Sequence, residues 1–181
     1  TPALYLTGAQ GGMIYNDDPQ TILLTDYGAI QYSWLNGKKI ISKSKAEEDL
    51  AVYLENNVNA CLEDFPEDSY NVEHDYTKAD AKVTFQQKNI ILTIDLPTIV
   101  STGSNNLVKI DTYTTSLPTS FGNLFSSAES LIDNKQGDIG ITELSNLVYE
   151  PTILPFDESV TIYSLKDEQD SIKDLSFMFA V

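Results

Sequence analysis

The chain has 181 residues, of which 41% are apolar, and this is enough for one domain with a substantial hydrophobic core. Acidic residues number 27 and basic residues 11, all of them lysine, so the formal net charge is −16 at pH 7. Such a charge opposes binding to a nucleic-acid backbone or to an anionic membrane surface. No apolar run reaches about 18 residues, so no membrane-spanning helix is predicted within the chain.

An apolar run near the start, Ala3–Leu6, leads into Gly11 and Gly12. Glycine follows the last turn of many helices because it adopts a positive φ without strain. We therefore interpret TPALYLTGAQGG as the end of a longer helix whose remaining part would be a membrane anchor.

The next segment, residues 13–45, is rich in turn-forming residues and contains two short predicted strands, at 21–25 and 30–35. The pair Asn36-Gly37 follows the second strand. Because both residues tolerate a positive φ, this pair predicts a tight type I′ hairpin turn.

The clearest predicted helix starts at Ser44, which can form a capping box with Glu47, and ends at Phe65. Apolar residues recur at helical spacing along it, at Leu50, Leu54, Val58, Cys61, Leu62 and Phe65. The opposite face is acidic, with Glu47, Glu48, Glu55 and Glu63. We expect Leu54 and Val58 to be fully buried against a sheet.

Three segments after this helix alternate apolar and polar residues, namely 81–87, 89–100 and 107–115. This period of two is typical of antiparallel strands with one face in water. A second helix is predicted after Pro118, over residues 119–135. Three further strands are predicted at 151–156, 160–165 and 175–181.

These elements predict an α+β fold, in which one long amphipathic helix and a second helix cover an antiparallel meander. Residues 1–45 would form a small region of strands and turns beside an α+β core of residues 46–181. We expect the two parts to make one compact domain.

Charge is distributed unevenly along the chain. Residues 27–45 contain four lysines and no acid, whereas residues 46–80 contain eleven acids and one lysine. One interpretation is that oppositely charged residues of neighbouring molecules pair, namely Lys38, Lys39, Lys43 and Lys45 with Glu47, Glu48 and Glu55. The alternative is a solvated acidic helix face beside a basic loop.

No motif in the sequence identifies a reaction or a ligand. The glycine-rich stretch Thr7–Gly12 lacks the Gly-Lys-Ser/Thr ending of a phosphate-binding loop. Asp17, Asp18 and Asp26 offer oxygen ligands for calcium, but the EF-hand spacing is absent and an Asn-Asp-Asp-Pro turn also explains the first two. The single histidine, His74, lies in a polar stretch. We therefore expect no catalytic residue, no metal and no cofactor.

An enzyme remains the alternative from a different class. It would be a hydrolase that uses paired carboxylates such as Asp17, Asp26 or Asp95. A pocket that holds two carboxyl groups about 5–10 Å apart would favour it.

Several segments occur together in a recognisable order: LYLTGAQGGMI, QYSWLNGKK, DLAVYLENNVNACLEDF, VTF followed by NIILTIDLP, and LSFMFAV. This order resembles an uncharacterised family of membrane-anchored ectodomains from small-genome, DPANN-type archaea. The resemblance implies an N-terminal transmembrane helix, pilin-like in some members, that continues through a cysteine-containing stalk. The chain departs from the family where Ser33-Trp34 replaces a Tyr-Trp doublet.

Cys61 is the only cysteine. On helical spacing it is a small core residue. The resemblance implies another role, in which a helix cysteine at this position pairs with the stalk cysteine, as exported proteins favour disulfides. Both interpretations stay open.

The resemblance and the absence of a catalytic motif together predict an extracellular cell-surface domain, anchored in the cytoplasmic membrane, with a binding or assembly role. Its partner would be a protein or another cell-surface component, and not nucleic acid. A head domain of a pilin-like filament is an alternative form of this role. We expect the chain by itself to be a soluble monomer, because copies with a net charge of −16 repel each other.

Overall fold

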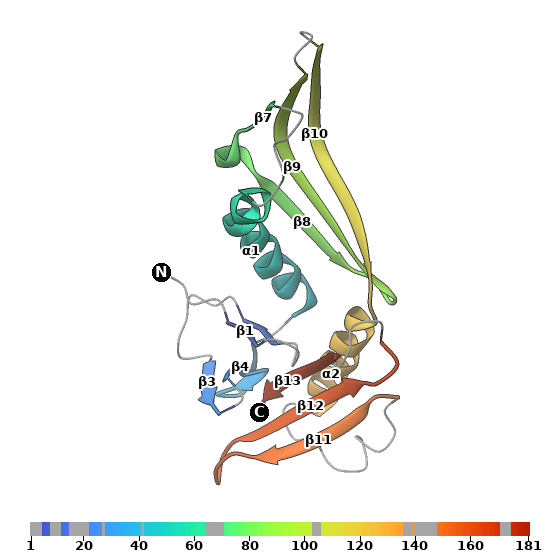
Figure 1. Cartoon of the computed structure of the whole chain (residues 1–181). Coiled ribbons are helices and arrows are strands. Elements are labelled where there is room, and N and C mark those ends of the chain that lie inside the picture. The colour runs from blue at the N-terminus through green and yellow to red at the C-terminus, as the bar shows by residue number, and fades with distance from the viewer. Residues whose placement is uncertain are drawn as a thin grey trace.

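A long β-hairpin stands at one end of the molecule, and a smaller sheet with a helix forms the other end (Figure 1). The structure is a computed structural model. It describes the following residues: 5–7, 12–14, 22–26, 28–40, 42–63, 71–102, 106–135, 139, 148–170 and 175–181.

The first described residues form strands. β1 (Tyr5–Thr7) pairs antiparallel with β2 (Gly12–Ile14), so the prediction that this part of the chain ends a helix is wrong for Tyr5–Thr7. Tyrosine and threonine both favour strands. Gly12 therefore begins a strand and does not follow a helix.

Two more short hairpins follow. β3 (Ile22–Thr25) pairs with β4 (Gly28–Gln31), and β5 (Trp34–Leu35) pairs with β6 (Lys38–Lys39). Between β5 and β6, Asn36 has a φ of 51° and Gly37 a φ of 75°, as a type I′ turn requires. The predicted Asn-Gly turn is confirmed.

Helix α1 (Lys43–Glu63) begins one residue before its predicted start. The backbone N–H of Lys45 donates to Ser42 Oγ at 3.2 Å, so Ser42 caps the helix in place of Ser44. Leu54 and Val58 are only half-buried, and the prediction that both are fully buried is wrong. The predicted end at Phe65 lies outside the described residues.

The larger sheet is built around a central strand, β9 (Asn89–Thr102). β10 (Asn106–Pro118) pairs with β9 along nearly its whole length. On the other side of β9, β8 (Asp80–Phe85) covers one half and β7 (Asn71–His74) the other. A short 3₁₀ helix, Tyr76–Lys78, connects β7 to β8.

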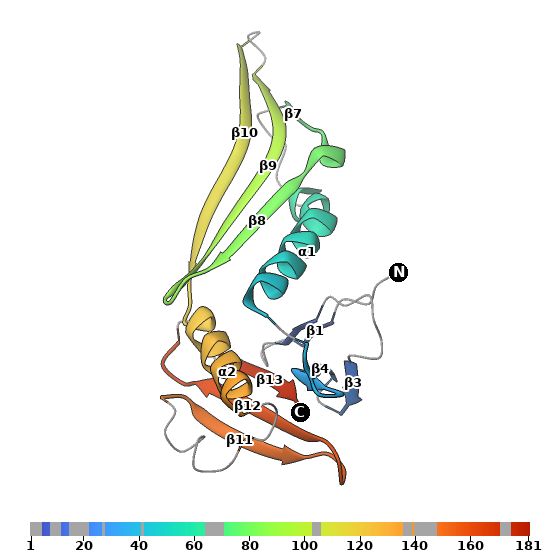
Figure 2. The same cartoon turned by 180° about the vertical axis from the view of Figure 1, so that it is seen from behind.

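The second sheet has the order β11 (Glu150–Pro155), β12 (Thr161–Asp167) and β13 (Leu175–Ala180), all antiparallel. Helix α2 (Phe121–Lys135) lies on this sheet (Figures 1 and 2). Its apolar side chains are buried, and so are those of β12 and β13 except Met178, which is half-buried. The predicted helix at 119–135 and the three predicted C-terminal strands are confirmed.

Aromatic rings join the two sheets. The Phe85 ring from β8 meets the Phe121 ring of α2 edge-on at 5.1 Å between centroids, and Phe125 lies 5.1 Å from Phe177 of β13. All four side chains are buried. One core cluster therefore contains residues of β8, β9, α2, β12 and β13.

The predicted fold class is wrong in its architecture. The fold is mostly β, because strands make up 52% and helices 27% of the described part of the chain. The described strands form several small sheets instead of one meander under a long helix. Two reasons are visible. The C-terminal strands pair with each other to make a sheet of their own, and α1 packs along β8, at the side of the larger sheet (Figure 2).

Candidate functional site

Several of the residues predicted to mediate contacts between molecules form ion pairs within the chain. Lys39 Nζ lies 3.0 Å from Glu129 Oε1 and 2.8 Å from Asp133 Oδ1, both on α2. Burial lowers the pKa of Lys39, but its hydrogen bonds to the two carboxylates outweigh this, and the net pKa is raised. These two ion pairs therefore connect the β5–β6 hairpin to α2.

The other two predicted lysines with partners, Lys43 and Lys45, lie in the first turn of α1. Lys45 Nζ is 2.7 Å from Asp49 Oδ1, and Lys43 Nζ is 4.0 Å from Glu47 Oε1. The hydrogen bond from Lys45 to Asp49 raises the pKa of the lysine. Lys38 is exposed. A contact of these residues with a neighbouring molecule stays a prediction.

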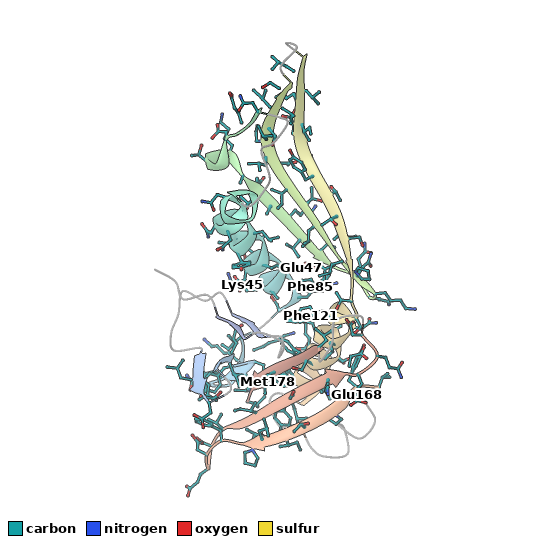
Figure 3. All side chains as sticks on the ribbon, viewed as in Figure 1. Lys45, Glu47, Phe85, Phe121, Glu168 and Met178 are labelled. Atoms are coloured by element: carbon teal, nitrogen blue, oxygen red, sulfur yellow. The ribbon has the colours of Figure 1, made fainter. Side chains whose placement is uncertain are left out.

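Two of the predicted acidic residues bind the backbone of an edge strand. Glu47 Oε1 accepts a hydrogen bond from the N–H of Phe85 at 2.7 Å, and Glu55 Oε1 accepts one from the N–H of Ala81 at 2.8 Å (Figure 3 labels Glu47 and Phe85). Ala51, on the same helix face between the two glutamates, is buried. Helix α1 therefore satisfies the free side of β8 with carboxylates.

The outer side of β11, with which no described strand pairs, is protected in a different way, because it has few backbone N–H donors. Thr161 and Val181 exchange backbone hydrogen bonds at 2.9 Å, so alternation along β12 directs Ile162, Ser164 and Lys166 toward β11. The β11 residues that turn their backbone outward are then Pro151, Ile153 and Pro155. Because proline has no N–H, this edge offers a single outward donor.

On the outer side of β10, no described helix binds the backbone, and no proline interrupts residues 112–117. Since the N–H groups of Ala81 and Phe85 point away from β9, alternation directs Ile90, Leu92 and Ile94 toward β10. Their partners Leu117, Thr115 and Tyr113 point back to β9. The intervening residues therefore turn their N–H and C=O groups outward, namely Thr112, Thr114 and Ser116.

No other described strand pairs with this outer side of β10. Side chains from 111 to 118 are all exposed. A register shift separates Ile110 from Thr112, and an ion pair of 3.0 Å joins Lys109 to Asp111 beside it. The continuous open edge is thus the stretch from Thr112 to Leu117, which we call the β10 edge.

Apolar side chains are exposed where the hairpin projects furthest from the core. Val72, Val100 and Val108 stand side by side across β7, β9 and β10, and Val108 is 55% exposed. On the opposite face, Leu107 is 71% exposed and Ile99 is 41% exposed. We call these five residues the hairpin patch.

A cavity of about 570 Å³ lies where the two sheets meet. It is lined by the turn after β8, the start of α2, Tyr149, and the end of β12 with the turn that follows. Glu168, labelled in Figure 3, lies on this turn. The cavity contains three carboxylates, those of Asp167, Glu168 and Asp170.

Two of these carboxylates hold the start of α2. Ser120 Oγ donates to Asp167 Oδ2 at 2.5 Å, and the Ser120 N–H and Thr119 Oγ1 both donate to Asp170 Oδ2. Acidic groups at this end of a helix are stabilised by its unpaired N–H groups. Asp167 and Asp170 therefore have a structural role that needs no substrate.

Tyr149 lines the same cavity. Its burial raises the pKa of the phenol above its ordinary value of 10.0, and the charges of Asp167 and Asp170 raise it further, against a hydrogen bond with Asn123 that lowers it. The phenol therefore stays protonated at neutral pH.

Of the carboxylates named from the sequence, Asp26 and Asp95 are described, and they accompany strands of different sheets. Asp95 is exposed on the outer face of the sheet and accepts a hydrogen bond from Thr112 Oγ1 at 2.6 Å. Asp26 is exposed after β3. Asp17 and Asp18 lie outside the described residues, as do the side chains of Cys61 and His74. Within the described part, no three His, Cys, Asp or Glu residues are placed to hold a metal ion.

Comparison of the chain with known protein families, with curated proteins and with solved structures finds no match. Among the described helices, none combines the length and apolar character needed to cross a bilayer.

Sequence reasoning missed both the β10 edge and the cavity. The signal for the edge was present, because residues 112–116 are hydroxyl- and tyrosine-rich and carry no charge, proline or glycine. The signal for the cavity was the acidic turn 167–170. Its partners at the start of α2 lie about fifty residues away in sequence, with a separation of 47 for Ser120 and Asp167.

Proposed function

We propose that this chain is an extracellular, membrane-tethered cell-surface domain that binds a partner through its β9–β10 hairpin. The resemblance to membrane-anchored archaeal ectodomains, and the acidic, arginine-free composition, support the location. The tether would be an apolar helix encoded upstream of Thr1. The upstream gene sequence tests this part, because an apolar segment of about 20 residues is expected there.

The observation that supports a binding role is the hairpin patch. Val72, Val100 and Val108 lie together on one face of the sheet, and Ile99 and Leu107 are exposed on the other. Grouped apolar side chains of this kind are typical of interaction sites. Leu107 and Val108 are 71% and 55% exposed, and they lie near the start of β10, in the part of the hairpin that projects from the core (Figure 1).

Binding of the labelled chain to cells of the source organism tests the proposal. The double variant Leu107→Ser, Val108→Thr should reduce the bound fraction at least tenfold. Leu24→Ser is a matched control, since Leu24 on β3 is also 71% exposed but lies far from the hairpin in the fold (Figure 1). Equal loss of binding in the control, or no loss in the double variant, contradicts a role for the hairpin patch.

The cavity favours a second candidate, a carboxylate-dependent hydrolase that acts on cell-surface polymers. Glu168 is the cavity carboxylate that does not cap α2, and its side chain is 68% exposed. Release of reducing ends from envelope polysaccharide, lost in Glu168→Gln, would establish this activity. Because Asp167 and Asp170 are accounted for by the helix start, we place this candidate second.

A further inference from the structure

We propose that the β10 edge accepts an extended segment of a partner protein as an additional strand of the larger sheet. The segment would be neutral or basic and would alternate apolar with polar side chains. This inference rests on the proposed binding function, and it adds the site, the geometry and the chemistry of the partner.

The backbone carries the first step. Thr112, Thr114 and Ser116 turn three N–H and three C=O groups outward along one uninterrupted stretch. Main-chain groups arranged in this way are the template for strand addition. Pro118, which has no N–H, ends the stretch at the core side.

The treatment of the other edges carries the second step. Unpaired edges promote aggregation, and proteins cover or interrupt them. Here α1 covers β8 with Glu47 and Glu55, and two prolines interrupt β11. β10 is the longest described strand at the edge of a sheet. Between Thr112 and Leu117 it has neither a described helix against its outer side nor a proline. An edge kept open while the edges of β8 and β11 are protected is explained by a strand that fills it.

The side chains beside the edge set the pattern of the partner. On the core-facing side, Tyr113 is 38% exposed and Leu117 is 43% exposed, so apolar side chains of an added strand would pack against them. On the other side, Thr112 bonds to Asp95 and Thr114 Oγ1 lies 3.2 Å from Thr93 Oγ1. These hydroxyls form a polar surface, so the side chains of an added strand on this face would be polar.

Charge separates a partner segment from a second copy of the chain. Residues 106–118 contain one lysine and one acid, so the strand itself is neutral in a chain with a net charge of −16. Pairing of the β10 edges of two copies would bring together two molecules that each carry a net charge of −16 and that repel each other. A neutral or basic segment avoids this repulsion and is attracted by the acidic molecule around it.

The experiment selects binders of the full chain from a displayed library of random 12-residue peptides. The variant Thr114→Pro removes an outward N–H and the side-chain contact with Thr93, and it leaves the backbone hydrogen bonds to β9 in place. Ile153→Pro is the matched control, because it removes the outward N–H of β11. We expect selected peptides to be non-acidic and alternating. Thr114→Pro should weaken their binding at least tenfold and Ile153→Pro less than twofold.

Circular dichroism and thermal unfolding show whether the two proline variants fold. If Thr114→Pro does not fold, protection of the Thr112, Thr114 and Ser116 amides from exchange by the selected peptide replaces it as the readout. No selected peptide, or peptides that bind Thr114→Pro as well as wild type, would overturn the inference.

Two outcomes separate this inference from the proposed function. Peptides that lose affinity only in Leu107→Ser, Val108→Thr overturn strand addition but keep the hairpin as a binding element. Self-association of the wild-type chain that Thr114→Pro abolishes would instead assign the edge to a second copy, and this also overturns the inference.

Discussion

The side chain of Glu47 accepts a hydrogen bond from the backbone N–H of Phe85 at 2.7 Å, across 38 residues of sequence. Glu55 repeats the contact at Ala81, eight residues further along α1 and four residues back along β8. Eight residues of helix and four residues of strand both span about 12–13 Å. The two elements are therefore matched in length, and the helix runs antiparallel to the edge that it satisfies.

Loss of the first contact should be measurable. Glu47→Ala leaves the Phe85 N–H without its partner beside the core, which costs about 1–3 kcal/mol of unfolding free energy. Urea denaturation gives the free energy, and amide exchange at Phe85 should accelerate in parallel. Glu48→Ala is the control, since the Glu48 side chain is 68% exposed. A variant at Glu47 no less stable than the Glu48 control would show that the edge contact contributes nothing.

The meeting point of the two sheets depends on a glycine. A Cβ atom added to Gly122 would lie 2.1 Å from the carbonyl oxygen of Gln86, which belongs to the turn between β8 and β9. The Thr119 N–H also donates to Lys88 O in this turn, at 3.0 Å. The start of α2 thus sits directly on the backbone of the turn.

Gly122→Ala should therefore destabilise the chain by about 1–3 kcal/mol, because backbone atoms cannot move aside as a side chain can. Thermal or urea unfolding measures the loss. Ser126→Ala, at an exposed position of the same helix, should leave stability within about 0.5 kcal/mol. Equal stabilities of the two variants would mean that the close approach at Gly122 does not exist in solution.

The cavity tyrosine gives a prediction for alkaline pH. In the unfolded chain Tyr149 loses its proton near pH 10, whereas in the folded chain burial and the charges of Asp167 and Asp170 raise its pKa. Its contribution to stability is therefore fully present below pH 10 and is lost as the pH rises through the folded-state pKa. Wild type should lose more stability than Tyr149→Phe in this window.

Ultraviolet titration at the phenolate band checks the assignment directly. Subtraction of the Tyr149→Phe curve from the wild-type curve should isolate one transition above pH 10. A difference curve with its midpoint at or below pH 10 would contradict the raised pKa.

Local pattern was sufficient for the elements of the fold and insufficient for their assembly. The period of two in residues 81–115 gave β8, β9 and β10, and helical spacing gave α2, because these periods follow from backbone geometry alone. The Asn36-Gly37 turn was equally local. In contrast, Tyr5–Thr7 had too few residues for any period to be read.

The position of α1 shows why assembly was missed. An amphipathic helix beside a sheet is expected to cover a face of the sheet, and its charged residues are expected in water. Here Glu47 and Glu55 bind strand backbone, and their role depends on which edge of which strand lies opposite. The small residue Ala51 between them is a signal for close approach, but it does not name the partner strand.

The β10 edge could not be predicted from the sequence for the same reason. The free side of a strand can be identified only when all other strands have been placed, and the register that turns Thr112, Thr114 and Ser116 outward follows from contacts of β8 with α1. The sequence contained the uncharged, proline-free stretch, and the structure supplies its neighbours.

The openness of the edge can be read in the free protein. Amides of Tyr113, Thr115 and Leu117 point to β9 and should exchange at least about 100-fold more slowly than those of Thr112, Thr114 and Ser116. Residue-resolved amide exchange by NMR measures this alternation. Uniform exchange along the strand would contradict the register.

The most direct test of the binding proposal is the same measurement repeated with envelope vesicles from the source organism. Strand addition at β10 predicts that the fast amides of Thr112, Thr114 and Ser116 become slow, while the amide of Ile153 on the free side of β11 keeps its rate. Vesicle binding that leaves these three amides unchanged, or that slows the amides around Tyr149 and Glu168 instead, would contradict it.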